Sequence, residues 1–236
     1  MIPWLTGNAP FPPVERALRS PNGLLAAGGD LSAPRLLEAY RHGIFPWFNP
    51  GEPALWWSPD PRMVLIPGEL KISRSFTKVL RNAAYEVRCD TGFEQVMRNC
   101  AAPRGKQSGT WINEDMIAAY CALHEMGYAH SVETWIDGHL AGGLYGVSIG
   151  RMFYGESMFS HTTNASKIAL AHLARQLERW QADHPTKGMI DCQMNTAHLA
   201  SLGAREIPRS EFIARLQELI NCEPVARWQF DADLFT

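Results

Sequence analysis

The spacing of apolar and polar residues divides the chain into two parts. From residue 68 onward, apolar positions recur at the periods of helices and strands, whereas the preceding residues keep neither period for long. Helices are expected at 74–83, 114–126, 164–180, 196–202 and 210–220, and strands at 129–136, 139–148, 151–156, 188–194 and 204–207. This order predicts an α+β fold, in which a mixed sheet is flanked by helices.

Short polar residues and one dipeptide fix several of these boundaries. Ser73 is the expected N-cap of the first helix, and Asn164 and Ser210 are expected to open two later ones. The dipeptide Asp137-Gly138 is a strong signal for a tight turn between antiparallel strands. The two strands on either side of this turn should therefore form a hairpin.

The first part of the chain is rich in proline, glycine and tryptophan. Closely spaced prolines in its second half exclude long regular elements, because proline lacks a backbone N–H and fixes φ. Trp47, Trp56 and Trp57 can still fill a compact, loop-rich unit. We therefore expect a small Pro/Trp-rich N-terminal domain over residues 1–67 and a larger domain over residues 68–236.

Composition bears on the compartment and on the type of partner. Hydrophobic residues make up 46% of the chain and charged residues 19%, which is enough apolar material for a sizeable core. The formal net charge is −2, so any contact with nucleic acid must come from a local basic patch. The five cysteines contain no CxxC pair, so neither a disulfide framework nor a metal site is expected. Without a signal peptide or a long apolar run, the expected location is the cytoplasm.

One basic stripe stands out on the first expected helix. Arg74, Lys78 and Arg81 are spaced by four and three residues, so they share one helix face, and Lys71 adds charge just before it. Such a stripe can bind nucleic-acid phosphates without reading sequence. The alternative is the solvated face of an ordinary amphipathic helix.

Asp191 and Gln193 lie two residues apart in an expected strand, so alternation sends both side chains to one face. The acid can orient the amide, whose carbonyl then accepts a hydrogen bond or a proton from an incoming amine. The alternative is a polar strand face in solvent. Cys192 points to the opposite, core-facing side and is expected to be a buried structural thiol rather than a nucleophile.

Glu156 lies at the end of an expected strand, among aromatic and methionine side chains. A carboxylate in such surroundings needs a partner or takes a raised pKa, and it can bind a cationic group of a substrate. The alternative is a surface or capping glutamate. Three histidines lack metal-ligand or triad spacing and are expected to be structural: His130, His161 and His198.

Four glycines in or beside one expected strand indicate bulges or the close approach of another backbone or a ligand: Gly142, Gly143, Gly146 and Gly150. They do not form a dinucleotide-binding fingerprint, and no P-loop pattern is present. The sequence therefore offers no recognisable site for a nucleotide cofactor.

Six segments, taken in order, carry a family resemblance. They are PNGLLAAGGDLS (21–32), YRHGIFPWFNPGEPALWWSPDPR (40–62), GTWINEDMIAAYCALHEMGYAHSVE (109–133), LAGGLYGV (140–147), FYGESMFSHTTNASKIAL (153–170) and MIDCQMNTAHLASLGAREIPR (189–209). Over nearly its whole length the chain resembles the leucyl/phenylalanyl-tRNA–protein transferases. The motifs IFPWF, WWSPDPR, GESMFS and DCQ are the most specific.

The resemblance implies a reaction and a fold. Enzymes of this family take leucine or phenylalanine, and less well methionine, from aminoacyl-tRNA. They join it to proteins that begin with arginine or lysine, which creates a bacterial degradation signal. The aminoacyl ester is already activated, so neither a cofactor nor a metal ion is expected. The resemblance also implies a GNAT-like catalytic domain behind a small N-terminal domain, and we further expect a monomer.

The resemblance also implies which residues form the site. Asp191, Gln193 and Glu156 match the family's proposed catalytic residues. Four residues match positions around the aminoacyl-adenosine and the donor side chain: Trp47, Trp111, Leu144 and Phe153. Leu144 stands where the family has methionine and Tyr154 where a smaller residue is usual, which bears on the preference among the three donor amino acids.

These expectations combine into one mechanism. The basic stripe holds the tRNA backbone, while the two tryptophans stack on the terminal adenosine. The acceptor's amine then attacks the ester carbonyl. Gln193 positions this amine, and Glu156 binds either the amine or the cationic side chain beside it.

Two other functions compete with this reaction. A coenzyme A-dependent N-acetyltransferase could use the same fold, but the sequence lacks a loop for the pyrophosphate. A non-catalytic module that binds tRNA or peptides would explain the basic stripe and the aromatic residues. It would leave the three polar site residues without a purpose.

Overall fold

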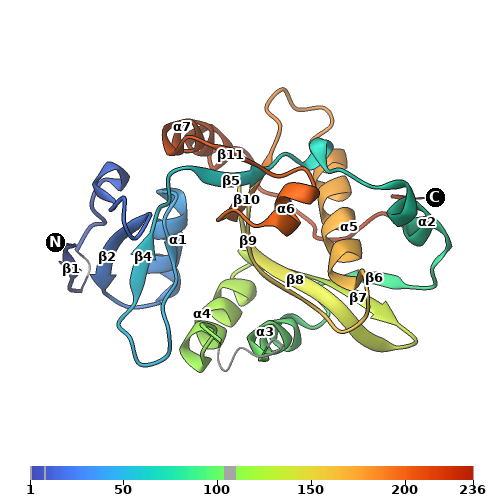
Figure 1. Ribbon diagram of the computed structural model, residues 1–236, viewed down its shortest axis with the longest axis horizontal. Coiled ribbons are helices and arrows are strands. Elements are labelled where there is room, and N and C mark those ends of the chain that lie inside the picture. Colours follow the sequence, from blue (N-terminus) through green and yellow to red (C-terminus); the bar gives the residue numbers. More distant parts are fainter. Residues whose placement is uncertain (1, 8, 104–109, 236) are drawn as a thin grey trace.

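The structure is a computed structural model that describes residues 2–7, 9–103 and 110–235 (Figure 1). The strands are β1 Trp4–Leu5, β2 Leu24–Gly28, β3 Phe45–Pro46, β4 Leu55–Trp57, β5 Arg62–Leu65, β6 Glu86–Cys89, β7 Ala129–Ile136, β8 His139–Ile149, β9 Met152–Ser160, β10 Met189–Gln193 and β11 Arg205–Ile207. The α-helices are α1 Ala33–Arg41, α2 Arg74–Asn82, α3 Phe93–Ala101, α4 Glu114–Glu125, α5 Ala165–Trp180, α6 Ala197–Ser201 and α7 Arg209–Leu219. Val14–Arg16 and Pro67–Glu69 form single turns of 3₁₀-helix.

The strands form a small sheet and a large one. The small sheet has the order β1-β2-β4-β3, and the seven-stranded sheet has the order β11-β5-β10-β9-β8-β7-β6. In the large sheet, β9 and β10 run parallel, whereas the other neighbouring strands run antiparallel. Helix α5 covers one face of this sheet, and α3 and α4 cover the other (Figure 1). The predicted mixed sheet with flanking helices is confirmed.

Local sequence signals are confirmed in part. The Ser73 hydroxyl accepts a hydrogen bond from the Phe76 N–H at 3.2 Å, as an N-cap should. Asp137 and Gly138 both adopt positive φ and join β7 to β8. Asn164 opens α5 as predicted, because it occupies the N-cap position directly before Ala165, although its side chain makes no capping hydrogen bond. The cap predicted at Ser210 is wrong, because α7 begins at Arg209 behind Pro208.

Strand β9 is longer than expected, and this moves Glu156. The strand continues to Ser160, so Glu156 lies within it rather than at its end. Glycine and glutamate are weak strand formers, but pairing with β8 carries the strand through them. The sequence also failed to predict β6 and α3. Strand β6 is a short, half-exposed edge strand, which leaves little alternation to detect.

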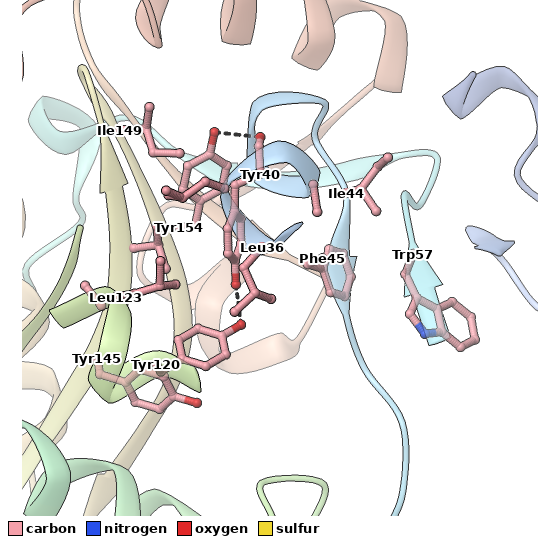
Figure 2. Packing of buried hydrophobic residues seen from close by; sticks show 14 of the residues in the cluster. Leu36, Tyr40, Ile44, Phe45, Trp57, Tyr120, Leu123, Tyr145, Ile149 and Tyr154 are labelled. Atoms are coloured by element: carbon pink, nitrogen blue, oxygen red, sulfur yellow. Dashed lines mark hydrogen bonds between the residues drawn. The ribbon is translucent and has the colours of Figure 1, made fainter. Parts of the chain in front are cut away.

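The two sheets share one apolar core. Tyr40 of α1 packs against Tyr154 of β9 with 4.8 Å between ring centres, and the Tyr154 hydroxyl donates to the Tyr40 carbonyl at 2.9 Å (Figure 2). The same core contains Trp56 of the small sheet and Tyr120 of α4. Strand β5 lies before the expected division at residue 67, yet it pairs with β10 and β11 in the large sheet.

The glycines of β8 make room for the protein's own chain. A Cβ atom on Gly146 would lie 2.2 Å from the Tyr154 carbonyl oxygen and 2.7 Å from the Phe153 ring. Gly150 has φ of +58° and meets the carbonyl oxygen of Leu219 in the same way. The close approach predicted from these glycines is therefore internal packing, not contact with a ligand.

Candidate active site

A cavity of about 440 Å³ opens where β9 and β10 separate. The two parallel strands pair only as far as Tyr154 and Asp191. Beyond this point β9 continues along β8, while β10 bulges and ends, so their side chains face an opening instead of each other. Glu156 and Gln193 both line this cavity. All four residues expected around the aminoacyl group line it as well: Trp47, Trp111, Leu144 and Phe153.

The cavity has an apolar end and an aromatic mouth. Leu144, Phe153 and Ile190 are almost completely buried and form part of its apolar wall, together with residues of α5. Trp47 is 39% exposed, and its carbonyl accepts a hydrogen bond from the indole N–H of Trp57 at 2.6 Å. One of the two departures from the family pattern lies outside the cavity, because Tyr154 faces Tyr40 on the other side of the sheet (Figure 2). The other, Leu144, lies in its wall.

Glu156 is the centre of the polar part. Its carboxylate accepts hydrogen bonds from the hydroxyls of Tyr40 at 2.8 Å and Tyr120 at 3.2 Å, and from the side-chain amide of Gln193 at 2.9 Å. The two tyrosine hydroxyls are also hydrogen-bonded to each other (Figure 2). Burial raises the pKa of Glu156 to about 7, and the tyrosine hydrogen bonds oppose this shift. The carboxyl therefore holds its proton to a higher pH than an exposed glutamate does.

Asp191 and Arg62 form a fully buried ion pair beside this group. Arg62 Nε and Nη2 lie 2.8 and 2.6 Å from the two carboxylate oxygens of Asp191. A third guanidinium nitrogen, Nη1, donates to the Gly43 carbonyl at 3.1 Å. The guanidinium also lies over the rings of Phe45 and Phe212. This geometry satisfies the bidentate pairing that makes a buried charge tolerable.

Asp191 holds the backbone of Gln193 rather than its side chain. Asp191 Oδ1 accepts the Gln193 backbone N–H at 2.9 Å, and Gln193 adopts φ of +61° in a β-bulge. The predicted contact from acid to side-chain amide is therefore wrong. Instead, the Gln193 amide nitrogen donates to Glu156, an orientation that suits the ionised carboxylate because that form only accepts hydrogen bonds. The bulge breaks the alternation on which the prediction relied.

Cys192 lies in the wall of the cavity. The sequence placed it on a core-facing side with Ile190, and that side proves to be the pocket. The thiol is partly buried, and burial raises its pKa well above the usual range. The thiol is thus less buried than expected, but it stays protonated, which disfavours a nucleophilic role.

The predicted basic stripe lies apart from the cavity. Helix α2 packs Phe76 and Leu80 against α5, and the charged residues on the rest of its surface are exposed. They are Lys71, Arg74, Lys78 and Arg81. None of the four lines the described cavity. The stripe is thus on the same side of the large sheet as α5 (Figure 1).

The three histidines differ in their surroundings. His130 stacks on Trp228, and His161 contacts Asn99 Oδ1 at 2.6 Å, so both have structural contacts. His198 lines the cavity, and burial lowers its pKa. The sequence placed no histidine in the pocket, so its position there is a correction.

Three residues of the polar part were missed by sequence reasoning. They are Tyr40, Tyr120 and Arg62. Tyr120 lies in a helix that the sequence predicted without assigning this residue a role, and the others lie in the first part of the chain. No local pattern signals a contact between residues 116 positions apart, such as Tyr40 and Glu156.

Within the residues that the structure describes, no group of three or more histidine, cysteine or carboxylate side chains is placed to hold a metal ion. Within the same ranges, no helix combines the length and apolar character needed to span a membrane.

Two family models match this chain. The model described as leucyl/phenylalanyl-tRNA protein transferase matches residues 64–217, and the model for the N-terminal domain of the same proteins matches residues 29–60. Leucyl/phenylalanyl-tRNA–protein transferases of Nitrosospira multiformis and Nitrosomonas europaea are each 66% identical to it. The alignments cover 98% of this chain and 98% and 96% of those proteins.

Two solved structures that resemble this chain are distant from it in sequence. A GCN5-related N-acetyltransferase from Kribbella flavida is 10% identical, with a TM-score of 0.36 over 72% of this chain and 59% of that one. The L-PGS structure from Bacillus licheniformis is 9% identical, with a TM-score of 0.40 over 80% and 71%. Neither score reaches 0.5, so neither neighbour informs the site.

The matched models and relatives, together with a pocket that joins an apolar end to a polar group, place this chain among the aminoacyltransferases that draw on charged tRNA. It belongs to the leucyl/phenylalanyl-tRNA–protein transferase family. Its substrates are therefore an aminoacyl-tRNA, which carries leucine or phenylalanine, and a protein that receives the amino acid.

Proposed function

We propose that this enzyme transfers leucine or phenylalanine, and methionine less well, to the N-terminal arginine or lysine of acceptor proteins and so marks them for degradation. The observation that carries the proposal is the single cavity in which an apolar end adjoins the Glu156–Gln193 pair. The donor side chain fits the first part, and the reacting amine fits the second. Charged tRNA and new proteins meet in the cytoplasm, to which we assign the reaction.

The apolar end supports the choice of donor. Its walls of aliphatic and aromatic side chains exclude charged amino acids, because an unpaired charge there would lose its hydration. Such a pocket separates similar apolar side chains only modestly, by about 1–3 kcal/mol per methylene group. This is consistent with one site that accepts leucine, phenylalanine and methionine.

The mouth and helix α2 support binding of the tRNA. We assign Trp47 and Trp111 to stacking on the terminal adenosine, which is worth about 1–3 kcal/mol per base. The exposed stripe on α2 is assigned to the phosphate backbone, where it holds the stem without reading its sequence. Binding should therefore weaken as salt concentration rises.

The polar part supports the transfer step. The neutral amine of the acceptor attacks the ester carbonyl carbon and the new C–N bond forms. The bond to the ribose oxygen breaks, and this oxygen takes up the proton that the attacking nitrogen gives up. The amide nitrogen of Gln193 donates to Glu156, so its carbonyl oxygen is the end that can accept a hydrogen bond from the amine. Asp191 contributes by holding the bulge that presents Gln193. Most of the acceleration is assigned to positioning, since the ester is already reactive.

Glu156 supports the choice of acceptor. A carboxyl with a pKa near 7 is readily ionised by a neighbouring cation, and an N-terminal arginine or lysine supplies one or two. The same carboxylate can take the proton that the α-ammonium group must lose before it attacks, because that group has a similar pKa of about 8. Both roles require the hydrogen bonds that hold Glu156 in place.

The decisive experiment is transfer of labelled leucine from Leu-tRNA to a peptide that begins with arginine. The matched controls are the same peptide with an acetylated N-terminus and one that begins with glutamate, and neither should be modified. Incubation with labelled acetyl-coenzyme A tests the rival acetyltransferase. Acetylation of the peptide, or the lack of any leucyl-peptide bond, would contradict the proposal.

A further inference from the structure

The C-terminal segment 222–235 lies along α5 like a strap, and we call it the C-terminal strap. Gln176 of α5 is fully buried and makes two hydrogen bonds to Asp231, at 3.1 Å to its carboxylate and 2.7 Å to its backbone N–H. Arg179 pairs with Asp231 and Asp233, and Phe235 packs on His172. The strap lies beyond residue 217, where the matched family model ends.

Trp228 is the residue of the strap that reaches the large sheet. Its ring stacks on His130 of β7 with centres 3.7 Å apart and planes 10° apart. The ring nitrogens of His130 lie 2.8 Å from Asp90 Oδ2 and 3.2 Å from the Gly127 carbonyl oxygen, which fixes the imidazole plane. On another side Trp180 meets Trp228 edge to face, at 5.4 Å. Trp228 is therefore held rigidly.

Trp228 lies behind Phe153, which lines the cavity. The ring centres of Trp228 and Phe153 are 5.9 Å apart, but Trp228 does not line the cavity itself. The edge of the Phe153 ring lies directly over Gly146, where a built Cβ would approach it to 2.7 Å. The Phe153 ring is thus confined between the glycine backbone, Trp228 and the open pocket.

We propose that Trp228 sets the depth of the donor side-chain pocket by fixing the position of Phe153. It acts as a positioning residue that contributes to the choice between leucine and phenylalanine. This inference rests on the proposed function, since it requires that the apolar end holds the donor side chain. No residue of the strap needs to touch the substrate.

The test is Trp228→Ala, with kcat/KM measured for Leu-tRNA and Phe-tRNA and the same Arg-initiated peptide. Loss of the indole leaves space behind Phe153 into which its ring can retreat, so the pocket becomes deeper. The ratio of kcat/KM for phenylalanine over leucine should rise about 10-fold, in the range that one or two methylene groups decide. Trp228→Phe keeps a smaller ring and should give an intermediate ratio.

Phe230→Ala is the matched control. Phe230 packs on Trp180 in the same strap, with 5.8 Å between ring centres, so its loss loosens the strap without removing the ring behind Phe153. Its donor ratio should equal that of the wild type. If Trp228→Ala does not fold, the inference is tested by the ratio of kcat/KM for phenylalanine over leucine in Trp228→Phe.

The possible outcomes separate the inference from the function. An unchanged ratio in a folded, active Trp228 variant overturns the inference and leaves the proposed function intact. An equal loss of both donors also overturns it, because a purely structural role predicts that result. If the wild type transfers neither amino acid, the proposed function itself fails.

Discussion

At the scale of single residues, Glu156 shows how burial and hydrogen bonding compete. The hydroxyls of Tyr40 and Tyr120 favour the ionised carboxylate, yet the loss of hydration outweighs them and raises the pKa to about 7. In the unfolded chain the same carboxyl has a pKa of about 4.3. Between these two values the folded protein binds more protons than the unfolded chain, so Glu156 stabilises the fold less as pH rises.

Glu156→Gln should remove this dependence. The difference in free energy of unfolding, variant minus wild type, should grow by about 1–3 kcal/mol as pH rises from 5 to 8. The reason is that the wild-type carboxyl must ionise in its buried site over that interval. Urea unfolding of both proteins at several pH values measures the difference. Parallel pH profiles for the two proteins would show that Glu156 does not titrate in this range.

The contribution of the Asp191–Arg62 ion pair to stability can be measured separately from the proposed role of Asp191 in transfer. Asp191→Ala leaves a buried guanidinium without its partner and should lower the free energy of unfolding by about 3–5 kcal/mol. The double variant Asp191→Leu with Arg62→Met removes both charges and should recover most of this loss. Transfer should remain low in the double variant, because the Gln193 backbone has lost its acceptor.

Two measurements on these variants test the assignment. Unfolding in urea reports the stability, and single-turnover transfer reports the reaction. Affinity for aminoacyl-tRNA should stay close to that of the wild type in the double variant. If affinity falls as far as turnover, Asp191 belongs to the binding of the tRNA and not to the presentation of Gln193.

At the scale of elements, helix α2 divides its surface between packing and charge. Its apolar face is buried against α5, so changes on the basic face should not disturb the fold. The sequence predicted this helix and its cap because both signals are local. The sequence could equally predict the hairpin of β7 and β8, because the dipeptide Asp137-Gly138 is itself typical of a tight turn.

Reversal of Arg74 and Lys78 to glutamate should weaken tRNA binding and flatten its salt dependence. The slope of log K against log salt should fall in magnitude by about 2, one for each lost phosphate contact. Arg16→Glu with Arg19→Glu, in the small N-terminal unit, changes the net charge equally and serves as control. Equal salt-dependence slopes for the two double variants would show that α2 does not contact the tRNA.

Features that depend on contacts between distant parts of the chain could not be predicted from the sequence. The bulge at Gln193 depends on Asp191, which is itself held by Arg62 of another strand. The span of β9 through Glu156 depends on its pairing with β8. The motifs therefore pointed to Glu156, Asp191 and Gln193, but neither their hydrogen bonds nor their partners Tyr40, Tyr120 and Arg62 could be predicted.

At the scale of the whole molecule, the small and large sheets share one core. The two units should therefore unfold together, because separation would expose Tyr40, Tyr120 and their neighbours to water. Leu25→Ala in the small sheet and Leu173→Ala beside the large one should each shift a single urea transition. Far-UV circular dichroism and tryptophan fluorescence should report the same midpoint for each variant. Separate midpoints would show that the units are independent.

The polar group around Glu156 also has a consequence for the enzyme during its own synthesis. Its donors come from residues 40, 120 and 193, so they leave the ribosome at widely separated times. Until Gln193 has emerged, Glu156 lacks its amide partner and the pocket lacks the wall that β10 provides. An incomplete nascent chain, although charged tRNAs and new N-termini surround it at the ribosome, should therefore be unable to catalyse transfer.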